Sequence, residues 1–441
     1  MHYSLETSFT FHPIGQGCFY TGQIRRSGCS PFFFVYDCGT YSKHQNLQQA
    51  ITGFKELCKG KLDLLLISHF DNDHVNEVLH LLRNPDLECR RLIIPYYFPG
   101  ERLRLVVNTE EADPEYRRMM RDPVLYFSEM GNIKEIIVIG APDDKDEIEN
   151  GNLVIPPGDK PPFDNGNNNT GTLGFDDDYD KERADSFYES IPSSEQRKLP
   201  KIKYIAIPYR LSVGIATWEF LFYLKKGNEY DIIIDFNKAV DTLVKEYGGS
   251  IYTLFEEEPM RELKKRYKTY IGGTMNSTSL VTYHGPAFRI NNEDYGVKSS
   301  IIAEGDKFST LLTGDIDMDG VKKIKSLERY FGGNLENILC FQVPHHGSAN
   351  NWLIQPTKNV LHGFPHYIIN HGLGRPHHPG EEVITDIQVK CPDAGIHLNN
   401  EVSRFDYEFK YFSWAEDFGI LDTDIPASKP LKFKRLPRKK T

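Results

Sequence analysis

The stretch LLLISHFDNDHVNEVLHLL, residues 64–82, gathers four side chains that could bind a metal ion: His69, Asp71, Asp73 and His74. An apolar run of strand length precedes them, and apolar residues at helical spacing follow. A turn at the carboxyl end of a buried strand can point alternate side chains into one concavity. Imidazole and carboxylate ligands together suit zinc or manganese. The alternative, a simple helix cap, requires only one Asp or Asn and no histidine.

Three later stretches place metal-capable residues at the ends of apolar, strand-like runs. They are Asp315 after FSTLLTG, His345 and His346 after LCFQVP, and His371, His377 and His378 after YIIN. Each stretch alone is a weak signal, because an isolated histidine is more often a surface or core residue. Together with the first stretch, they predict one metal site assembled from several strand ends.

The bulk composition predicts a globular protein without a membrane segment. The chain has 441 residues and a net charge of −10, and it can bury one large core or two smaller ones. No basic segment followed by an apolar one opens the sequence, so we expect a cytoplasmic protein that does not contact a membrane. The acidic balance argues against a surface coated with Lys and Arg for duplex DNA. The seven cysteines form no CxxC pair, and we expect them to be reduced.

Two segments stand apart by their charge. Residues 143–189 carry fourteen acidic against four basic residues and lack an apolar period, so we predict a mobile insertion over 141–200. The end of the chain, KPLKFKRLPRKKT, has seven basic residues and no acidic one. A solvated tail over 426–441 is one interpretation, and an auxiliary contact to nucleic acid or to an acidic partner is the other.

The combination of HxDxDH, LLTGD, HHGS and HPxxEV resembles the metallo-β-lactamase superfamily, in particular its ComEC-like hydrolase subgroup in a stand-alone form. The stretches IGQGCFYTGQI and FFFVYDCGT are similar to that subgroup's opening hairpin, whose second strand ends in an Asp, here Asp37, shortly before Gly39. The resemblance spans roughly residues 8–110 and 200–390. It implies an α/β fold, a four-layer αββα sandwich with the metals at one edge. We therefore expect one hydrolase domain over 1–425, interrupted by the insertion.

Carried over residue by residue, the resemblance implies two divalent ions, zinc or manganese. The ligands that it implies are His69 and Asp71 for the first ion, Asp73 and His74 for the second, Asp315 between both, and the later histidine His345. The implied catalytic residues are Asp73, which directs the attacking hydroxide, His346, which contacts the substrate or orients the neighbouring ligand, and His378, which donates a proton. The commoner superfamily motif has histidine at the place of Asp71, and this difference favours the ComEC-like subgroup over a β-lactam hydrolase.

One ligand of the superfamily pattern has no clear counterpart. Many members supply a further histidine between the first motif and the bridging aspartate, and this interval offers only His80 and His284. Neither has a convincing sequence context. The first metal site is therefore expected to be weak, selective for one metal, or completed by His378.

The expected function is that of a metal-dependent phosphodiesterase or nuclease, because two divalent ions can activate a water and stabilise both oxygens of a phosphoryl displacement. Nucleic acid, with DNA favoured, is the first expected substrate. A small phosphodiester or other small ester, such as a cyclic nucleotide, is the alternative, and a non-catalytic regulatory module is a third. The resemblance also implies that the protein could act in a bacterial anti-phage defence system together with a partner ATPase.

A long single-stranded substrate would need a basic groove with aromatic side chains. The stretch RRLIIPYYFPGERLRL offers such residues. They are Arg90, Arg91, Tyr96, Tyr97, Phe98, Arg102 and Arg104. A core strand with a polar edge is the competing interpretation.

Overall fold

The computed structural model describes residues 3–83, 87–97, 99–109, 113–140, 199–207, 209–213, 218–224, 234–268, 279–287, 295–301 and 307–413. The predicted insertion, apart from its last two residues, and the predicted tail over 426–441 lie outside these ranges. No helix in the described part of the chain is long and apolar enough to cross a membrane.

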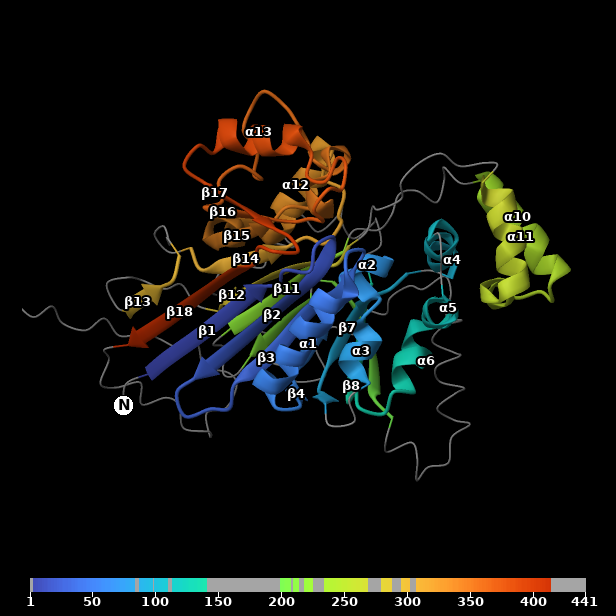
Figure 1. Ribbon diagram of the computed structural model, residues 1–441, viewed down its shortest axis with the longest axis horizontal. Helices are drawn as coiled ribbons and strands as arrows, with labels where there is room; N and C mark the ends of the chain where they lie inside the picture. The colour runs from blue at the N-terminus through green and yellow to red at the C-terminus, as the bar shows by residue number, and fades with distance from the viewer. Residues whose placement is uncertain are drawn as a thin grey trace, which may run out of the picture.

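The first of two large sheets has nine strands within the described ranges, in the order β13, β18, β1, β2, β3, β5, β7, β8, β9 (Figure 1). Their bounds are β13 Tyr295–Ser299, β18 Phe405–Ser413, β1 Tyr3–Phe11, β2 Gly17–Arg26, β3 Phe32–Thr40, β5 Leu64–Leu66, β7 Leu92–Pro95, β8 Glu135–Gly140 and β9 Lys201–Ala206. Neighbours are antiparallel up to β3 and parallel from β3 to β9. Two short strands, β4 (Lys61–Leu62) and β6 (Glu88–Cys89), pair separately.

The second sheet has seven strands in the described residues and repeats this arrangement. They are β10 Tyr209–Val213, β11 Trp218–Tyr223, β12 Val281–Pro286, β14 Ser309–Leu312, β15 Ile338–Gln342, β16 His366–Asn370 and β17 Gly395–Asn399, in that order across the sheet. The pairs up to β14 are antiparallel, and those from β14 to β17 are parallel. Each sheet therefore joins an antiparallel part to a parallel part.

Strand β5 shows why the chain folds into layers. Its side chains alternate between two faces, as in any strand. Leu64 and Leu66 pack in the core that includes the second sheet, whereas Leu65 and Ile67 pack in a separate core beneath helices. Because both faces are covered, the strand reads as a continuous apolar run instead of an alternating one.

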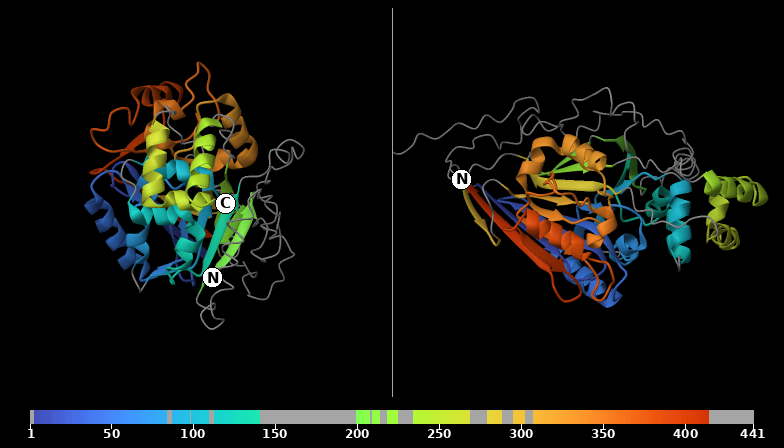
Figure 2. Two further views of the ribbon diagram at one scale, coloured as in Figure 1. Left: turned by 90° about the vertical axis from the view of Figure 1, so that its right-hand side faces the viewer. Right: turned by 90° about the horizontal axis from the view of Figure 1, so that it is seen from above.

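Helices cover the outer face of each sheet (Figures 1 and 2). Those beside the first sheet are α1 His44–Cys58, α2 Asn72–Val75, α3 Val78–Leu82, α4 Pro99–Asn108, α5 Pro114–Arg121 and α6 Pro123–Ser128, and those beside the second are α12 Val321–Phe331 and α13 Glu381–Lys390. On α1, Leu47, Ile51 and Phe54 face the sheet, and on α12, Tyr330 and Phe331 contact the ring of Tyr223. The predicted four-layer αββα sandwich is confirmed.

Further helical segments extend this framework. Helices α10 Ile234–Glu246 and α11 Glu257–Lys268, with the 3-10 turn η2 Ile251–Phe255 between them, lie beyond α4 and α5 in Figure 1. Short 3-10 turns also occur at η3 Gly332–Asn337, η4 His345–Gly347 and η5 Ala349–Asn351. The turn η4 is part of the site described below.

A chain of hydrogen bonds crosses the core between the two sheets. The indole of Trp218 donates to Nδ1 of His284 at 3.3 Å, and the other ring nitrogen of His284 lies 2.9 Å from the hydroxyl of Tyr20. Tyr20 is 2.9 Å from the hydroxyl of Tyr407, which in turn bonds the hydroxyl of Thr310. An indole only donates, so Nδ1 accepts and the proton of a neutral His284 sits on Nε2. This histidine therefore has a structural place between the sheets.

Candidate metal centre

The candidate ligands follow four strands that belong to the parallel parts of the two sheets. His69 and Asp71 follow β5, Asp315 follows β14, and His345 follows β15, while the loop after β16 leads to His378. Parallel strands present their carboxyl ends at the same edge, where α/β sheets bind their ligands. Residues almost 250 positions apart in sequence thus meet at one edge of the sandwich.

Asp315 lies at the centre of this cluster, and its two oxygens face different histidines. Oδ2 is 3.7 Å from Nε2 of His69 and 3.7 Å from Nε2 of His345. Oδ1 is 3.3 Å from Nε2 of His74 and 3.8 Å from Nε2 of His346. A carboxylate placed in this way can hold one ion with each oxygen, as the predicted bridging role requires.

The other two carboxylates divide between these two sides. Oδ2 of Asp71 lies 3.8 Å from Nε2 of His69, and Oδ2 of Asp73 lies 3.1 Å from Nε2 of His346. Three groups of possible ligand atoms in the described chain lie within a span of 4.8 Å; one of them, Asp37 with His69 and His74, includes a carboxylate that is discussed below, and the other two divide the centre. One group is His69, Asp71 and Asp315, and the other is Asp73, His74 and His346. The geometry thus offers two places for a cation.

The buried ring nitrogens show that these residues fit a metal. Nε2 of His69 and Nε2 of His74 are buried, and among the described residues neither has a hydrogen-bond partner. Such a nitrogen loses its hydration without compensation unless something else binds its lone pair. Divalent ions held by these residues would satisfy both nitrogens and the carboxylates around them. A mixture of imidazole and carboxylate ligands suits such ions, and the choice of zinc or manganese stays a prediction.

Asp37 orients two of these histidines from behind. Its Oδ1 accepts the backbone N–H of Ser68 at 2.7 Å, and its Oδ2 accepts the Ser68 hydroxyl at 2.6 Å and Nδ1–H of His74 at 2.8 Å. The Ser68 oxygen then accepts Nδ1–H of His69 at 2.8 Å. Both imidazoles are thereby fixed with Nδ1–H turned outwards and Nε2 turned inwards, where it could bind an ion. Although Asp37 lies near the centre, its oxygens are already occupied, so it is a positioning residue.

Sequence reasoning noted Asp37 only as part of a hairpin pattern and gave it no role. A signal for that role was present in FFFVYDCGT, where a carboxylate interrupts an apolar strand that must be buried. A buried carboxylate needs donors, and the donors nearest in the fold are the ligands themselves. Ser68 is the link between Asp37 and His69.

The histidine pair after β15 reaches the centre through an unusual backbone. His345 and His346 have φ angles of 49° and 56°, in the left-handed region that side chains with a Cβ rarely adopt. Nδ1–H of His345 donates to Oδ1 of Asn351 at 2.6 Å, and Nδ1–H of His346 donates to the carbonyl of Asn370 at 2.9 Å. Both rings therefore turn Nε2 towards Asp315.

This arrangement can be compared with the roles predicted for His345, a metal ligand, and His346, a residue that contacts the substrate or orients the ligand. His345 lies on the side of His69, where sequence reasoning found no further histidine for the first ion. His346 lies beside Asp73 and His74, although the sequence suggested a substrate contact or a supporting role. The geometry places both histidines at ligand positions, and their roles stay predictions.

The predicted proton donor His378 stands at the open side of the pair. Its ring centroid is 5.5 Å from that of His345 and 6.3 Å from that of His346. Its Nδ1–H donates to the carbonyl of Pro376 at 3.3 Å, and Nε2 is buried with no hydrogen-bond partner in the described chain. Burial, and then the nearby charge of His346, lowers the pKa of His378. The neutral ring thus presents a lone pair at Nε2.

The remaining histidines do not reach the centre. His80 is exposed on α3, and His284 lies between the sheets, so neither supplies the additional ligand that the superfamily pattern contains. His371 faces the carbonyl of Gly372 and the amide of Asn400. His377 is exposed.

The charges of the cluster reinforce one another. Burial alone would raise the pKa of Asp315, but the charges of His346 and His345 hold that pKa well below its usual range. For His74, burial acts in the opposite direction, and the carboxylates of Asp315 and Asp37 raise its pKa well above the usual value. Burial raises the pKa of Asp71. Buried carboxylates gathered this closely gain from a positive partner.

Of the two interpretations of RRLIIPYYFPGERLRL, the burial of most of its described side chains contradicts the basic and aromatic groove and agrees with the core strand, while Phe98 lies outside the described residues. Arg102 is only 1% exposed, and its Nη1 donates to the carbonyls of Met120 and Arg121 at 3.2 and 2.8 Å, at the end of α5. Arg104 and Tyr97 are also buried. The guanidinium of Arg102 satisfies the last carbonyls of a neighbouring helix, a contact that the local sequence does not reveal.

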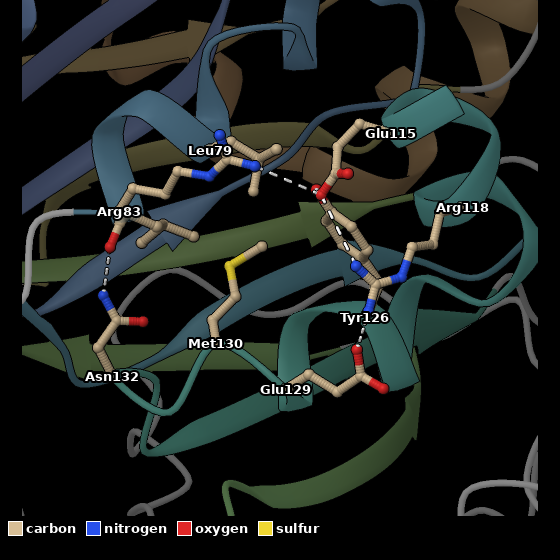
Figure 3. A pocket seen from close by; sticks show the side chains of 9 residues that line it. Leu79, Arg83, Glu115, Arg118, Tyr126, Glu129, Met130 and Asn132 are labelled. Atoms are coloured by element: carbon tan, nitrogen blue, oxygen red, sulfur yellow. Dashed lines mark hydrogen bonds and ion pairs between the residues drawn. The ribbon is translucent and has the colours of Figure 1, made fainter. Parts of the chain in front are cut away.

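A surface pocket of about 510 Å³ lies between α3, α5 and α6, and no candidate ligand lines it (Figure 3). Arg83 lies 3.6 Å from Glu115, and Arg118 pairs with Glu129. Because its arginines are already paired with carboxylates, this pocket does not offer the charge that a phosphate needs. The candidate centre lies elsewhere, at the edge of the sandwich.

Fold and site together define an αββα sandwich with a candidate dinuclear metal centre at its edge. No protein-family model matches the sequence, and no curated protein matches it either. Among solved structures, unliganded yeast PDE1 is similar over 92% of this chain and 99% of its own, at 10% identity and a TM-score of 0.35. The long form of RNase Z from yeast is similar over 83% of this chain and 36% of its own, at 8% identity and a TM-score of 0.29. Both likenesses are distant, and the layers and strand order above define the fold.

Proposed function

We propose that this chain is a metal-dependent phosphodiesterase. The observation that carries the proposal is the position of Asp315, whose two oxygens face two separate sets of imidazole nitrogens. Two divalent ions held there would supply the positive charge that stabilises the attacking and departing oxygens of a phosphoryl displacement. His69, Asp71 and His345 would hold one ion, Asp73, His74 and His346 the other, and Asp315 both.

The chain's own residues supply orientation and proton transfer. In the hydrolysis, the oxygen of a water bonds to phosphorus and the P–O bond to the departing group breaks. One water proton ends on the departing oxygen, and the other stays with the new phosphomonoester or passes to solvent. His378 is placed to move a proton at Nε2, which must first take up the proton that it later gives. Asp37 and Ser68 keep the ligand histidines in the tautomer that leaves Nε2 inwards.

Two substrate classes remain, and one observation favours the second. Nucleic acid, with DNA first, is the class that the ComEC-like resemblance suggests. The burial of Arg102 and Arg104 removes the groove proposed for a long single strand, which favours a short phosphodiester that occupies only the centre and its rim.

A metal-reconstituted panel tests the proposal. Purified protein loaded with zinc or manganese is assayed on single-stranded DNA, duplex DNA, RNA and bis(p-nitrophenyl) phosphate, with a chelated sample as control. We expect chelator-sensitive hydrolysis of at least one diester and no hydrolysis by Asp315→Asn. Two bound ions per chain with no turnover on any diester would support the third alternative, a regulatory module on the same fold.

The proposed role in anti-phage defence, beside a partner ATPase, rests on the resemblance alone. Affinity purification of the tagged chain from its host, followed by mass spectrometry, tests it. Recovery of an ATPase that depends on the tagged chain would support the role, and its repeated absence would remove it.

A further inference from the structure

Two loops meet at the open side of the candidate centre. One follows β3 and contains Tyr41. Its preceding residue, Thr40, is fixed to the ligand segment, because the side chain of Asn76 accepts the Thr40 N–H at 3.0 Å and donates to its carbonyl at 2.8 Å. Asn76 lies two residues after His74. The backbone at Tyr41 is therefore tied directly to the segment that holds two candidate ligands.

The second loop follows β16 and leads to His378. Its Arg375 donates through Nη2 to the carbonyl of Tyr41 at 2.8 Å, and the N–H of Tyr41 donates to the carbonyl of Gln16 at 2.7 Å. Both side chains remain accessible: Tyr41 is 45% exposed, and Arg375 is also exposed. The rim thus presents two exposed side chains, Tyr41 and Arg375, and the guanidinium of Arg375 is anchored to the backbone of Tyr41.

Glu401 connects the two loops by hydrogen bonds. Its carboxylate accepts the hydroxyl of Ser42 at 2.6 Å and the backbone N–H of Leu373 at 2.8 Å. The fit is tight enough to require glycine at position 15, where φ is +82° and a Cβ would lie 2.2 Å from the Ser42 hydroxyl and 2.6 Å from Glu401 Oε1. The rim is therefore built in advance of any ligand.

The backbone that leads to Tyr41 runs against the segment that holds two candidate ligands. A Cβ at Gly39 would lie 2.6 Å from the carbonyl carbon of Asp73 and 2.6 Å from the backbone nitrogen of Val75. The Tyr41 side chain at this rim still partly faces solvent. An exposed aromatic ring on a fixed backbone is the surface on which nucleobases stack, and every base has such a face. A guanidinium beside it matches a phosphate oxygen.

We propose that Tyr41 and Arg375 form a nucleotide subsite, in which the Tyr41 ring stacks on the base next to the scissile diester and Arg375 contacts a phosphate oxygen. This inference rests on the proposed phosphodiesterase function and deepens it by naming the substrate class, a phosphodiester with a nucleoside on one side. The subsite takes one nucleotide unit and needs no long groove.

Two chromogenic diesters that differ only in the nucleoside test the subsite. Thymidine 5′-(p-nitrophenyl phosphate) carries a base, and methyl p-nitrophenyl phosphate carries a methyl group in its place. We expect Tyr41→Leu to raise KM for the thymidine diester by ~10-fold and to leave KM for the methyl diester within about twofold. Tyr41→Phe keeps the ring and should leave both values within about twofold, which separates stacking from proton donation by the phenol.

Arg375→Ala is expected to raise KM for both diesters by ~10-fold, because both carry the phosphate. Its matched control is Arg404→Ala, another exposed arginine, which pairs with Asp406 at 2.7 Å on β18. The control should change neither KM. Circular dichroism and melting of each variant check that the fold is intact.

A binding measurement makes the test independent of turnover. Calorimetry compares thymidine 5′-monophosphate with 2-deoxyribose 5-phosphate, and Tyr41→Leu should abolish the preference for the base. If wild type hydrolyses both diesters and Tyr41→Leu does not reduce the preference for the base, the subsite is overturned and the phosphodiesterase function stands. Tyr41-dependent nucleotide binding without hydrolysis would overturn the function and keep the subsite. Neither binding nor hydrolysis would overturn both.

Discussion

Two buried sites that contain histidine differ in how their polar atoms are satisfied. One is the candidate metal centre, and the other is the hydrogen-bonded chain between the sheets. His74 and His284 are both 0% exposed. Around His284, Trp218 and Tyr20 engage both ring nitrogens. At His74, only Nδ1 is engaged among the described residues, and Nε2 faces Asp315 without a hydrogen bond. Burial alone therefore does not identify a metal ligand; at His74 the ligand assignment rests on an inward Nε2 without a hydrogen bond that faces a carboxylate.

The two clusters also differ in charge. Around His284, hydroxyls and an indole supply the hydrogen bonds, and burial lowers the pKa of this histidine to about 3. At the centre, the carboxylates of Asp315 and Asp37 overcome burial and raise the pKa of His74. The hydrogen-bonded chain at His284 is neutral and both ring nitrogens have partners, so it stabilises the fold. The candidate centre gathers charged groups with ring nitrogens that lack hydrogen bonds, so it would gain from a bound ion. The following experiments separate these two kinds of site.

The largest effect is expected for Asp315→Asn. As the proposed ligand of both ions, the Asp315 carboxylate would neutralise charge from each, so turnover should fall at least ~10²-fold, a loss of about 2.7 kcal/mol or more. Kinetics at saturating manganese on the best substrate, with elemental analysis, measure both consequences. Activity within about twofold of wild type would show that Asp315 only closes its turn, where Asn substitutes well.

The double substitution Asp73→Ala with His74→Ala should empty one of the two sites. The second group loses two of its three clustered members, whereas the first keeps His69, Asp71 and Asp315. Elemental analysis is expected to fall from two ions per chain to one. Unchanged metal content would remove these two residues from the ligand set.

His284→Ala should act on stability and not on metal binding. It leaves the Trp218 N–H and the Tyr20 hydroxyl without their partner, at a cost of about 2 kcal/mol in the free energy of unfolding. Urea denaturation measures that loss, and metal content serves as the control. Loss of an ion in this variant would mean that the contrast between the two clusters is wrong.

The smallest effect is a pH dependence. Unfolded His284 takes up a proton near its ordinary pKa of about 6.5, whereas the folded group stays neutral until about pH 3. The unfolded chain therefore binds more protons in this window, and stability falls as the pH is lowered. Between pH 6 and pH 5, wild type should lose about 1 kcal/mol more than His284→Gln, which cannot titrate. Parallel pH profiles for the two proteins would contradict the neutral assignment.

Sequence reasoning anticipated most of the centre because its residues follow strands. The runs before His69, Asp315 and His345 are continuous and apolar, and parallel strands bring their carboxyl ends to one edge. The four layers were expected from the resemblance to the metallo-β-lactamase superfamily. These features depend on local pattern and on general rules of sheet topology.

Features that depend on distant partners could not be anticipated. The left-handed backbone at His346, which turns its ring towards Asp73, is determined by the turn and its packing and not by residue type. The guanidinium of Arg102 is buried because a helix that ends at Arg121 offers free carbonyls. The residue type alone does not show whether an arginine is buried or exposed.

Strand β1 pairs through all nine of its residues with β18, from Tyr3 opposite Ser413 to Phe11 opposite Phe405. A ribosome releases β1, β2 and β3 long before it reaches β18, so the nascent antiparallel unit carries one edge of unpaired backbone amides and carbonyls for most of synthesis. Open edges of this kind recruit strands from other chains. Within the described chain, this edge of β1 therefore stays open to pairing with other chains until residue 413 has emerged.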